Sequence, residues 1–571
     1  MADPASAPPL RTASARPAPP LYRSALLRCL AGGYRRGDLL ADAQAGLLVA
    51  VVALPLSMAL AIASGLQPQD GLIAAIVGGI LISLFGGSRF QIGGPAGAFV
   101  GLCAAGVAQF GPSGLAMATV MAGVLLLAMG LLRLGKAISY IPVPVVVGFT
   151  TGIAVIIAST QIGPALDLAV PTVEHASDRV AWIAAHLDGW SWRALVVCVA
   201  TVVLIVGFRR LGPRFPGALV ALVVVTAVTW IGSIDVATIQ TRFAGGIPDH
   251  LPAPHAPDPT LGSAFTQVSA FLDRVRELSG LALAIALLGA IESLLSAVVA
   301  DGLGDDRHDA NSELVGQGIA NIITPFFAAL PVTGAIARTA TNIRAGARTP
   351  VAGILHGVFL LLFLLVAAPL VVHIPMAALA GVLFMVCWGM AELRHWPHIL
   401  KAGRSDAFLL PMAFGLTVFV DLTWAVIVGV LLAMFFFVRR MSEATEVARQ
   451  TGTDSQDAIA AVVPPGIEVF EVRGPFFFGA ATLIRDLDDQ LGAKPRAMIL
   501  RLPQVPFIDV SAAFALRELV VSCRKRGIRF LIADIHTRPY ADLERHGLRE
   551  LIGEDCVCGS LERAIEVAAA P

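Results

Sequence analysis

Long apolar runs separated by short polar links occupy most of the chain between residues 39 and 440. The first run begins near Ala43, and others follow at about 70–86, 114–134, 140–160, 191–208, 216–234, 280–301, 313–329, 349–372, 375–391, 406–420 and 422–438. A helix needs roughly 20 apolar residues to cross a bilayer. Together with two shorter, interrupted segments near 88–104 and 331–344, the runs predict about fourteen membrane spans.

Glycine and proline interrupt the two shorter segments. In the first, residues 91–99, Pro95 follows a pair of glycines, and the second, residues 330–335, contains Pro331 and Gly334. Pro95 favours the first turn of a helix that begins inside the membrane. Irregular backbone is tolerated there only where protein covers it or where it lines a cavity. Free N–H groups and the positive dipole end at such a helix start attract anions.

The two interrupted segments occupy the third place in two groups of about seven spans. The groups cover about 39–234 and 276–440, and a proline-rich loop at 235–275 separates them. An odd number of spans reverses the orientation of the second group, so the pattern predicts an inverted repeat. The two half-helices would then point their N-termini at each other near the middle of the membrane.

Loop charges favour cytoplasmic termini. The links predicted to lie inside carry several arginines and lysines, whereas the predicted outer loop 161–189 holds Asp167, Glu174, Asp178 and only Arg179. This distribution satisfies the positive-inside rule. Residues 1–38 are rich in proline, alanine and arginine, and they predict a disordered cytoplasmic leader without a cleavable signal peptide.

Composition supports an integral membrane protein. The 571 residues are 56% hydrophobic and 14% charged, where an ordinary soluble domain carries about 25% charged residues. The net charge of zero gives no indication of a nucleic-acid partner. The seven cysteines are scattered, and Cys556 and Cys558 lack a second Cys/His pair, so we expect no disulfide framework and no metal site. Because no nucleotide-binding or hydrolase motif occurs, we predict neither an enzyme nor a cofactor.

Beyond residue 440 the pattern changes. Residues 441–461 predict a polar linker and residues 462–571 a small α/β domain, in which strands at 466–473, 497–502 and 528–533 alternate with helices. An even number of spans places this domain in the cytoplasm. Asp509 or Ser511 would cap the helix that follows the second strand. Phosphorylation of Ser511 is the alternative, although no phosphate-binding glycine loop accompanies it.

Glu292 lies near the middle of the apolar run at 280–301. A carboxyl group inside a membrane is costly unless it is paired or protonated, which makes Glu292 a functional candidate. Its alternative role is a helix-packing hydrogen bond in the neutral form. Ser296 follows at the i+4 position, so its hydroxyl shares a helix face with the carboxyl group. The pair could take up a proton or help to bind Na⁺ through oxygen ligands.

Arg338 follows the second interrupted segment by about one helical turn. One interpretation is that it adds positive charge to an anion pocket. The alternatives are that it snorkels to the interface, or that it pairs with Glu292 or a backbone carbonyl. Asn311 and Ser312, followed by Glu313, are typical of a helix N-cap and predict a structural role.

The order of these motifs resembles the SulP family of anion transporters, the bacterial relatives of solute carrier family twenty-six. The resemblance covers about residues 37–560 and rests on ALPLSMA at 53–59, FGGS at 85–88 with GPAG at 94–97, YIP at 140–142 with VGF at 147–149, GAIESLLS at 289–296, and NSEL at 311–314 with Gly316 and Asn321. The C-terminal part resembles a STAS domain, with DVSA at 509–512. Segments 289–295 and 309–318 look closest to the C4-dicarboxylate transporter branch.

The resemblance implies a core domain and a gate domain, with substrate held between the third and tenth spans and moved by an elevator-like shift. Glu292 and Ser296 match the family's coupling-ion positions. Glu stands here where sodium-coupled bicarbonate members carry Asp, and Ile336 stands where they offer a threonine hydroxyl, which favours proton coupling. The substrate positions that the resemblance implies are Ala96, Gly97, Gly334, Ala335 and Ile336, and Arg338 is added from its place in the sequence.

The sequence thus predicts an all-α polytopic protein of a bacterial inner membrane, followed by a cytoplasmic α/β STAS domain. We expect proton-coupled uptake of a C4-dicarboxylate such as succinate, fumarate or aspartate. The alternatives within transport are sulfate or bicarbonate, coupled to protons or Na⁺, and outside transport an anion channel or a membrane sensor that signals through its STAS domain. The resemblance also implies a homodimer, and the STAS domain is expected to have a cytosolic protein partner.

Overall fold

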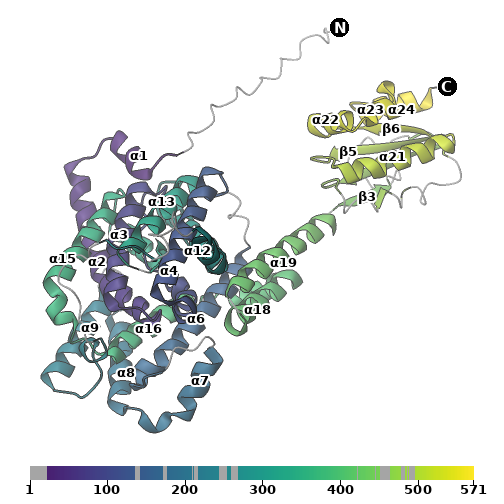
Figure 1. Cartoon of the computed structure of the whole chain (residues 1–571). Coiled ribbons are helices and arrows are strands. Elements are labelled where there is room, and N and C mark those ends of the chain that lie inside the picture. The colour runs from purple at the N-terminus through teal and green to yellow at the C-terminus, as the bar shows by residue number, and fades with distance from the viewer. Residues whose placement is uncertain are drawn as a thin grey trace. The chain divides into compact units, whose positions relative to one another are not determined.

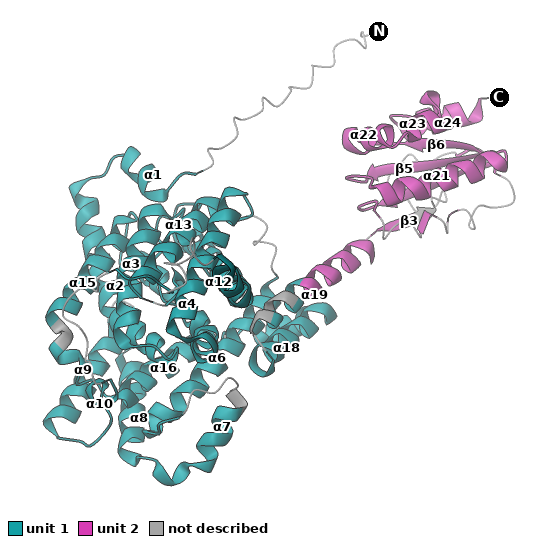
Figure 2. Cartoon of the chain, viewed as in Figure 1, with its two compact units in different colours: residues 1–430 teal, residues 431–571 magenta. Residues whose placement is uncertain are grey.

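The computed structural model describes residues 22–135, 142–170, 176–208, 210, 216–243, 254–258, 268–328, 330–420, 422–443, 445–449, 463–477, 483–484, 487 and 495–570. Figure 1 shows the whole chain. The chain divides into two compact units, residues 1–430 and residues 431–571 (Figure 2). The boundary falls within helix α19, Leu422–Glu443.

Unit 1 is mostly helical. Five of its described helical segments are long and apolar enough to cross a membrane, and four shorter apolar helices accompany them. The first set is α2 (Arg36–Ala63), α3 (Pro68–Phe85), the η1–α4 segment (Gly97–Leu131), α6 (Val143–Leu166) and α12 (Val268–Leu303), and the second is α8 (Trp192–Phe208), α9 (Gly217–Ile231), α15 (Val351–Val371) and α16 (Met376–Met390). Unit 1 also contains α1 (Ala25–Ala31), α7 (Ala176–Ala185), α10 (Ile239–Arg242), α13 (Ala310–Ile323), α14 (Ile336–Arg344), α17 (Trp396–Ala402) and α18 (Arg404–Phe419).

The helices of unit 1 pack as two groups. Helices α2, α3, α4, α12, α13, α14 and α15 contact one another and form what we call the core group. Helices α6, α8, α9, α16 and α18 form the gate group. Contacts between the groups are fewer and run through α2, η1 (Gly97–Phe99) and α4 on one side and α6, α9 and α16 on the other. The seam between the groups therefore crosses unit 1 beside the first interrupted segment.

Glycines allow the close helix crossings inside the core group. A Cβ atom on Gly123 of α4 would lie 2.7 Å from the backbone nitrogen of Ile322, and one on Gly316 of α13 would lie 2.6 Å from that of Gly86. Small residues at such positions let backbones approach, which is how helices associate in a membrane. Substitution there would push α13 away from α3 and α4.

The start of the chain differs from the predicted leader. Residues 1–21 lie outside the described residues, but α1 is helical within the stretch expected to be disordered through residue 38. Ser24 caps α1, and the Tyr22 hydroxyl donates to the carbonyl of Phe85 at 2.8 Å. The backbone nitrogen of Ala25 donates to Gly86 O at 2.9 Å. These long-range contacts anchor α1 to the core group, and the composition of the segment gave no sign of them.

Unit 2 contains a four-stranded sheet in the order β3-β4-β5-β6. The strands are β3 (Glu446–Arg449), β4 (Ile467–Arg473), β5 (Ala497–Gln504) and β6 (Arg529–Ala533), and the helices are α21 (Val510–Lys525), α22 (Thr537–Arg545), α23 (Leu548–Ile552) and α24 (Leu561–Ala569). Strand β3 pairs antiparallel with β4, whereas β4, β5 and β6 are parallel. The prediction of a linker at 441–461 is wrong for the residues of β3, because they pair with β4 and form the edge of the sheet. Residues 450–462 lie outside the described residues.

Candidate functional site

The two interrupted segments meet in a short antiparallel pair. Strand β1 (Gly93–Gly94) pairs with β2 (Thr333–Gly334), with Gly93 opposite Gly334. The backbone nitrogen of Ala335 also donates to the carbonyl of Ile92 at 2.9 Å. Glycine is required here because a Cβ on Gly334 would lie 1.8 Å from the side-chain nitrogen of Gln91. The crossing joins the two halves of unit 1 through their backbones.

A helix begins directly after each strand. Ala96 has an extended backbone before η1, which continues into α4, and Ala335 has an extended backbone before α14. The first backbone N–H groups of a helix have no partner within it. They carry a partial positive charge that favours anions. Because the strands are antiparallel, the two helices start at opposite ends of the same backbone pair.

Arg338 lies between these two helix starts. Its side chain is 2% exposed, and its guanidinium group donates to the carbonyl of Pro95, so α14 contacts the first interrupted segment through this side chain. The Nε and Nη1 atoms have no hydrogen-bond partner. Of the alternatives left open by the sequence, pairing with a carbonyl is what the structure contains, and snorkelling is excluded by the burial.

A cavity of about 630 Å³ opens beside the helix starts. Core-group and gate-group residues both line it, and most of the lining is apolar. Five of the six expected substrate positions lie in its wall: Ala96, Gly97, Ala335, Ile336 and Arg338. The sixth, Gly334, belongs to β2 and backs onto Gln91. Ligand cavities commonly measure about 300–1,000 Å³, so the volume is sufficient for a small organic anion.

Glu292 on α12 lines the same cavity. Its Oε2 atom is buried without a hydrogen-bond partner, and no contact within the described residues joins its carboxyl group to another side chain. Glu292 and Arg338 interact electrostatically, but no hydrogen bond links them. The helix-packing hydrogen bond considered for Glu292 is therefore not formed, and its carboxyl group is available to a proton or a ligand.

Ser296 faces α14 and not the cavity. Its hydroxyl lies 3.2 Å from the Thr339 hydroxyl, which in turn accepts from the backbone nitrogen of Ile92 at 3.1 Å. Both side chains are fully buried. Of the predicted shared helix face of Glu292 and Ser296, Ser296 contacts α14 at Thr339. In this arrangement Ser296 positions α14 against α12.

The sequence did not reveal a cluster of hydrogen-bond donors around one buried carboxyl group, that of Glu313, behind the crossing. Glu313 is fully buried, and it accepts hydrogen bonds from the backbone nitrogens of Gly87 and Ser88 at 2.9 and 3.1 Å. It also accepts from the side chains of Gln91, Ser293 and Gln317, at 2.9, 3.0 and 2.8 Å. The expected N-cap is wrong, because Asp309 caps α13 through Ser312 N at 2.8 Å. Local sequence suggested a cap because Glu313 lies in the first turn of a helix.

The cavity reaches the surface near residues that the sequence analysis did not select. Thr341 and Arg344 follow Arg338 on α14 at intervals of three, and both line the cavity together with Glu392. Residues three apart share a helix face. The face of α14 toward the cavity therefore carries a buried arginine at its start and an exposed one at its end, and this periodicity could have been found in the sequence.

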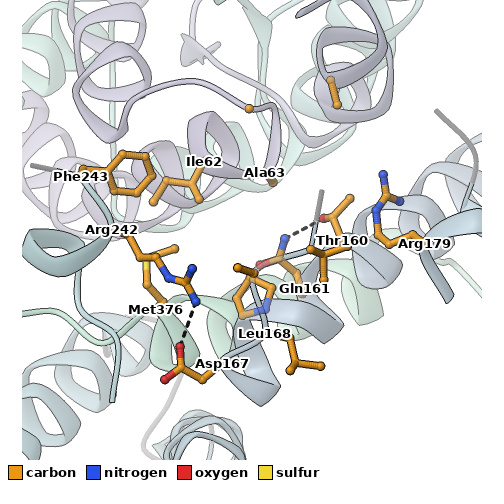
Figure 3. A pocket seen from close by; sticks show the side chains of 15 residues that line it. Ile62, Ala63, Thr160, Gln161, Asp167, Leu168, Arg179, Arg242, Phe243 and Met376 are labelled. Atoms are coloured by element: carbon orange, nitrogen blue, oxygen red, sulfur yellow. Dashed lines mark hydrogen bonds and ion pairs between the residues drawn. The ribbon is translucent and has the colours of Figure 1, made fainter. Parts of the chain in front are cut away.

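A second cavity, of about 270 Å³, lies elsewhere in unit 1. Figure 3 shows Arg242 directed at Asp167, Gln161 beside Thr160, and Arg179 on the other side. Arg242 Nη2 donates to Asp167 Oδ1 at 3.1 Å, and Gln161 Nε2 donates to the Thr160 hydroxyl at 2.7 Å. Ile62, Ala63, Gly65, Ala104, Pro164, Leu168, Ala169, Val170, Phe243 and Met376 complete the lining.

In unit 2, Asp509 and Ser511 lie at the start of α21. Asp509 is the N-cap, and its Oδ1 accepts from the backbone nitrogen of Ala512 at 2.8 Å. Ser511 is in the first turn with an exposed side chain. Of the two residues expected to cap this helix, Asp509 does so. The described residues contain no group of three or more His, Cys, Asp or Glu side chains that could hold a metal ion.

Known proteins resemble the chain over nearly its whole length. Residues 39–413 match the Sulfate permease family and residues 458–564 match the STAS domain. The "Putative sulfate transporter YvdB" of Bacillus subtilis is 41% identical over 525 residues, which are 91% of this chain and 96% of that protein.

Two solved structures resemble the fold. The inward-facing structure of murine Slc26a9, an anion transporter, has a TM-score of 0.82 at 18% identity and covers 96% of this chain and 94% of its own. The transmembrane domain of a cyanobacterial bicarbonate transporter, BicA, has a TM-score of 0.60 at 29% identity and covers 69% of this chain and 98% of its own.

Proposed function

The chain belongs to the sulfate permease family, and from this premise we propose that it is a proton-coupled secondary transporter of a small dianion, with a C4-dicarboxylate as its substrate. The observation that carries the proposal is the meeting of two helix starts, Arg338 and Glu292 in one cavity. Helix starts and a guanidinium group attract an anion. A carboxyl group beside them repels it until a proton neutralises the carboxylate.

The coupling follows from these charges. Anion binding at the helix starts favours protonation of Glu292, because an anion raises the cost of a nearby second negative charge. With Glu292 protonated, the loaded site carries less negative charge than it would with Glu292 ionised, so it crosses the membrane at lower cost. We propose that the core group carries it past the gate group in an elevator-like shift, which is supported by the sparse contacts along the seam.

The lining of the cavity supports a dicarboxylate. The walls that contain Arg338 and Arg344 also include Leu56, Leu288 and Val382, which suit the apolar carbons of succinate better than the fully polar surface of sulfate. The likeness of segments 289–295 and 309–318 to the C4-dicarboxylate branch points the same way. Ile336, whose side chain offers no oxygen ligand, favours a proton over Na⁺ as the coupling ion.

Sulfate is the second candidate, because the Bacillus subtilis relative YvdB carries a sulfate transporter name. Bicarbonate follows from the likeness to BicA. We also propose a bacterial inner-membrane location, a homodimer, cytoplasmic termini and about fourteen spans in two inverted repeats. These properties go beyond the family membership itself.

The deciding experiment is uptake of labelled succinate into proteoliposomes under an inward proton gradient, with unlabelled fumarate, sulfate and bicarbonate as competitors. Gradient-dependent uptake that fumarate alone blocks supports the dicarboxylate proposal. Uptake of sulfate or bicarbonate in place of succinate keeps the site and changes the substrate. Currents far above carrier turnover indicate a channel, and a complete lack of uptake indicates a sensor.

A further inference from the structure

The two cavities lie at different levels of one seam. Helices α2, α6 and α16 contribute to both, with Leu56 and Ile62 on α2 and with Val382 and Met376 on α16 lining the central and the second cavity, respectively. On α2 the residue that lines the second cavity comes later in the chain than the one that lines the central cavity, and on α16 it comes earlier, as expected if the cavities lie toward opposite ends of the seam. Figure 2 shows α7 and α10, which bear Arg179 and Arg242, at the end of unit 1 away from α1.

An apolar layer separates the cavities. Between the two sets of lining residues, Ile153 and Ile157 of α6 and Leu379 of α16 are 1%, 0% and 2% exposed. A Cβ on Gly97 would lie 3.5 Å from Ile157 Cδ1, so this layer contacts the first helix start. The central cavity reaches the exposed Arg344 on its other side. The second cavity is therefore closed off from the central one in this conformation.

The second cavity is polar on the side formed by α6, α7 and α10. Two guanidinium groups and one carboxylate line it, together with the amide of Gln161 and the hydroxyl of Thr160. Arg242 uses Nη2 for Asp167, and within the described residues its Nε and Nη1 have no partner. Arg179 is 8% exposed, and its Nη1 donates to the Ser159 hydroxyl at 2.9 Å. The opposite wall is formed by Ile62, Ala63 and Ala104 of the core group.

We propose that the second cavity is an anion-capture site, which binds the transported small anion from the side opposite the mouth at Arg344 before the central cavity opens there. The proposal rests on the proposed function for the identity of the anion. Arg242 and Arg179 bind the anion through guanidinium N–H groups, which match carboxylate and sulfate oxygens. Concentrating the anion beside the closed layer raises the rate at which the reopened central site is loaded.

The test compares Arg242→Gln, Arg179→Gln and the double variant with wild type in membrane vesicles of both orientations. The expected result is a KM raised about fivefold at low salt for transport from the second-cavity side, falling below about twofold in 0.5 M salt because salt screens the arginines. The KM from the opposite side and kcat stay unchanged. Equal KM changes at both faces, or none, would overturn the proposal.

Arg193→Gln is the matched control. Arg193 is exposed, lies 3.8 Å from Asp235 and does not line the cavity. If it raises the KM as much as Arg242→Gln does, general surface charge explains the effect and the capture site is wrong. Asp167→Asn tests the opposite direction: it removes a negative charge and keeps an oxygen for the backbone nitrogen of Ala237, so it should lower the KM.

Sulfate binding to the purified protein separates this proposal from the transport function. In Ala335→Trp or Ala96→Trp protein, where the indole covers a helix start of the central site, sulfate should still raise the thermal unfolding midpoint. The added pair Arg179→Gln and Arg242→Gln should remove that shift. Loss of the shift with the tryptophan alone, or its persistence without the arginines, would refute the capture site. Wild-type protein that binds sulfate but transports neither succinate nor sulfate nor bicarbonate would refute only the proposed function.

Discussion

At the scale of single residues, unlike charges beside an apolar cavity are the unusual feature. Arg338 keeps two nitrogens and Glu292 one oxygen without hydrogen bonds. Buried polar groups are normally paired, and leaving one unpaired costs about 1–3 kcal/mol. Such a cost persists where the free groups serve a ligand or a proton. The two residues therefore define the chemistry of the central site.

Replacement of Glu292 by glutamine should separate binding from coupling. Glutamine keeps the size of the side chain, and its amide does not take up or release a proton at the pH values of a transport assay. We expect exchange of unlabelled for labelled anion to continue in proteoliposomes, whereas an imposed proton gradient no longer drives accumulation. Accumulation equal to that of wild type would show that Glu292 does not couple transport to protons.

Glu313→Gln should destabilise the protein. The carboxylate accepts from two backbone and three side-chain donors, and an amide would set its own N–H₂ against some of them. A loss of about 2–3 kcal/mol is expected, measured as a lower unfolding midpoint in detergent. Glu277→Gln, at an exposed ion pair with Arg274, is the control and should change little. An unchanged midpoint for Glu313→Gln would contradict the cluster's structural role.

At the scale of elements, hydrophobic pattern predicted where helices lie better than where they meet. The run at 375–391 corresponds to α16, and the gap between the segments 88–104 and 114–134 corresponds to the break in α4 at Gly111, whose φ is 73°. The glycines of 91–99 indicated an interrupted helix. They could not indicate that Gly93 pairs with Gly334, because a pairing between distant segments leaves no local periodicity.

The same limit applies to the candidate site. Glu292 was found because a charge inside an apolar run is visible in the sequence. The breaks marked the segments of Ala96 and Ala335, and the family resemblance then implied these two positions; the structure places all three residues in one cavity. Glu313 was misjudged since its donors Gly87 and Ser88 lie 226 and 225 residues away. Its local sequence resembles the first turn of any amphipathic helix.

Gly334→Ala tests the crossing as an element. The added methyl group would occupy the place of the Gln91 amide, which bonds Ser293 and Glu313, so the amide must move. We expect a destabilisation of about 1–3 kcal/mol and loss of anion uptake. In the control Gly415→Ala, nothing lies near the new methyl group, and stability should be unchanged or higher. Normal uptake by Gly334→Ala protein would show that the crossing tolerates a side chain.

At the scale of the whole molecule, the division of unit 1 into two helix groups predicts motion along the seam. A Cβ on Gly101 of α4 would lie 3.3 Å from Ile156 Cγ2 on α6. Since Cγ2 is one bond beyond Cβ, the two Cβ atoms would be about 4–5 Å apart, which reaches the upper part of the Cβ separation of about 3.5–4.5 Å that a disulfide needs. The pair Gly101→Cys and Ile156→Cys should therefore form a bridge between core and gate groups. Oxidation should stop transport while anion binding remains, and reductant should restore transport. Undiminished transport by fully cross-linked protein would exclude sliding at this contact.

The crossing of the two interrupted segments also has a consequence for biogenesis. Pro95 and Arg338, which it brings into contact, are 243 residues apart in the chain. At synthesis rates of about 5–20 residues per second, the first segment waits on the order of 10–50 seconds for its partner to leave the ribosome. During that interval its free backbone groups face lipid, water or the insertion machinery. Nascent chains arrested before residue 330 should therefore be the forms most exposed to membrane quality-control proteases.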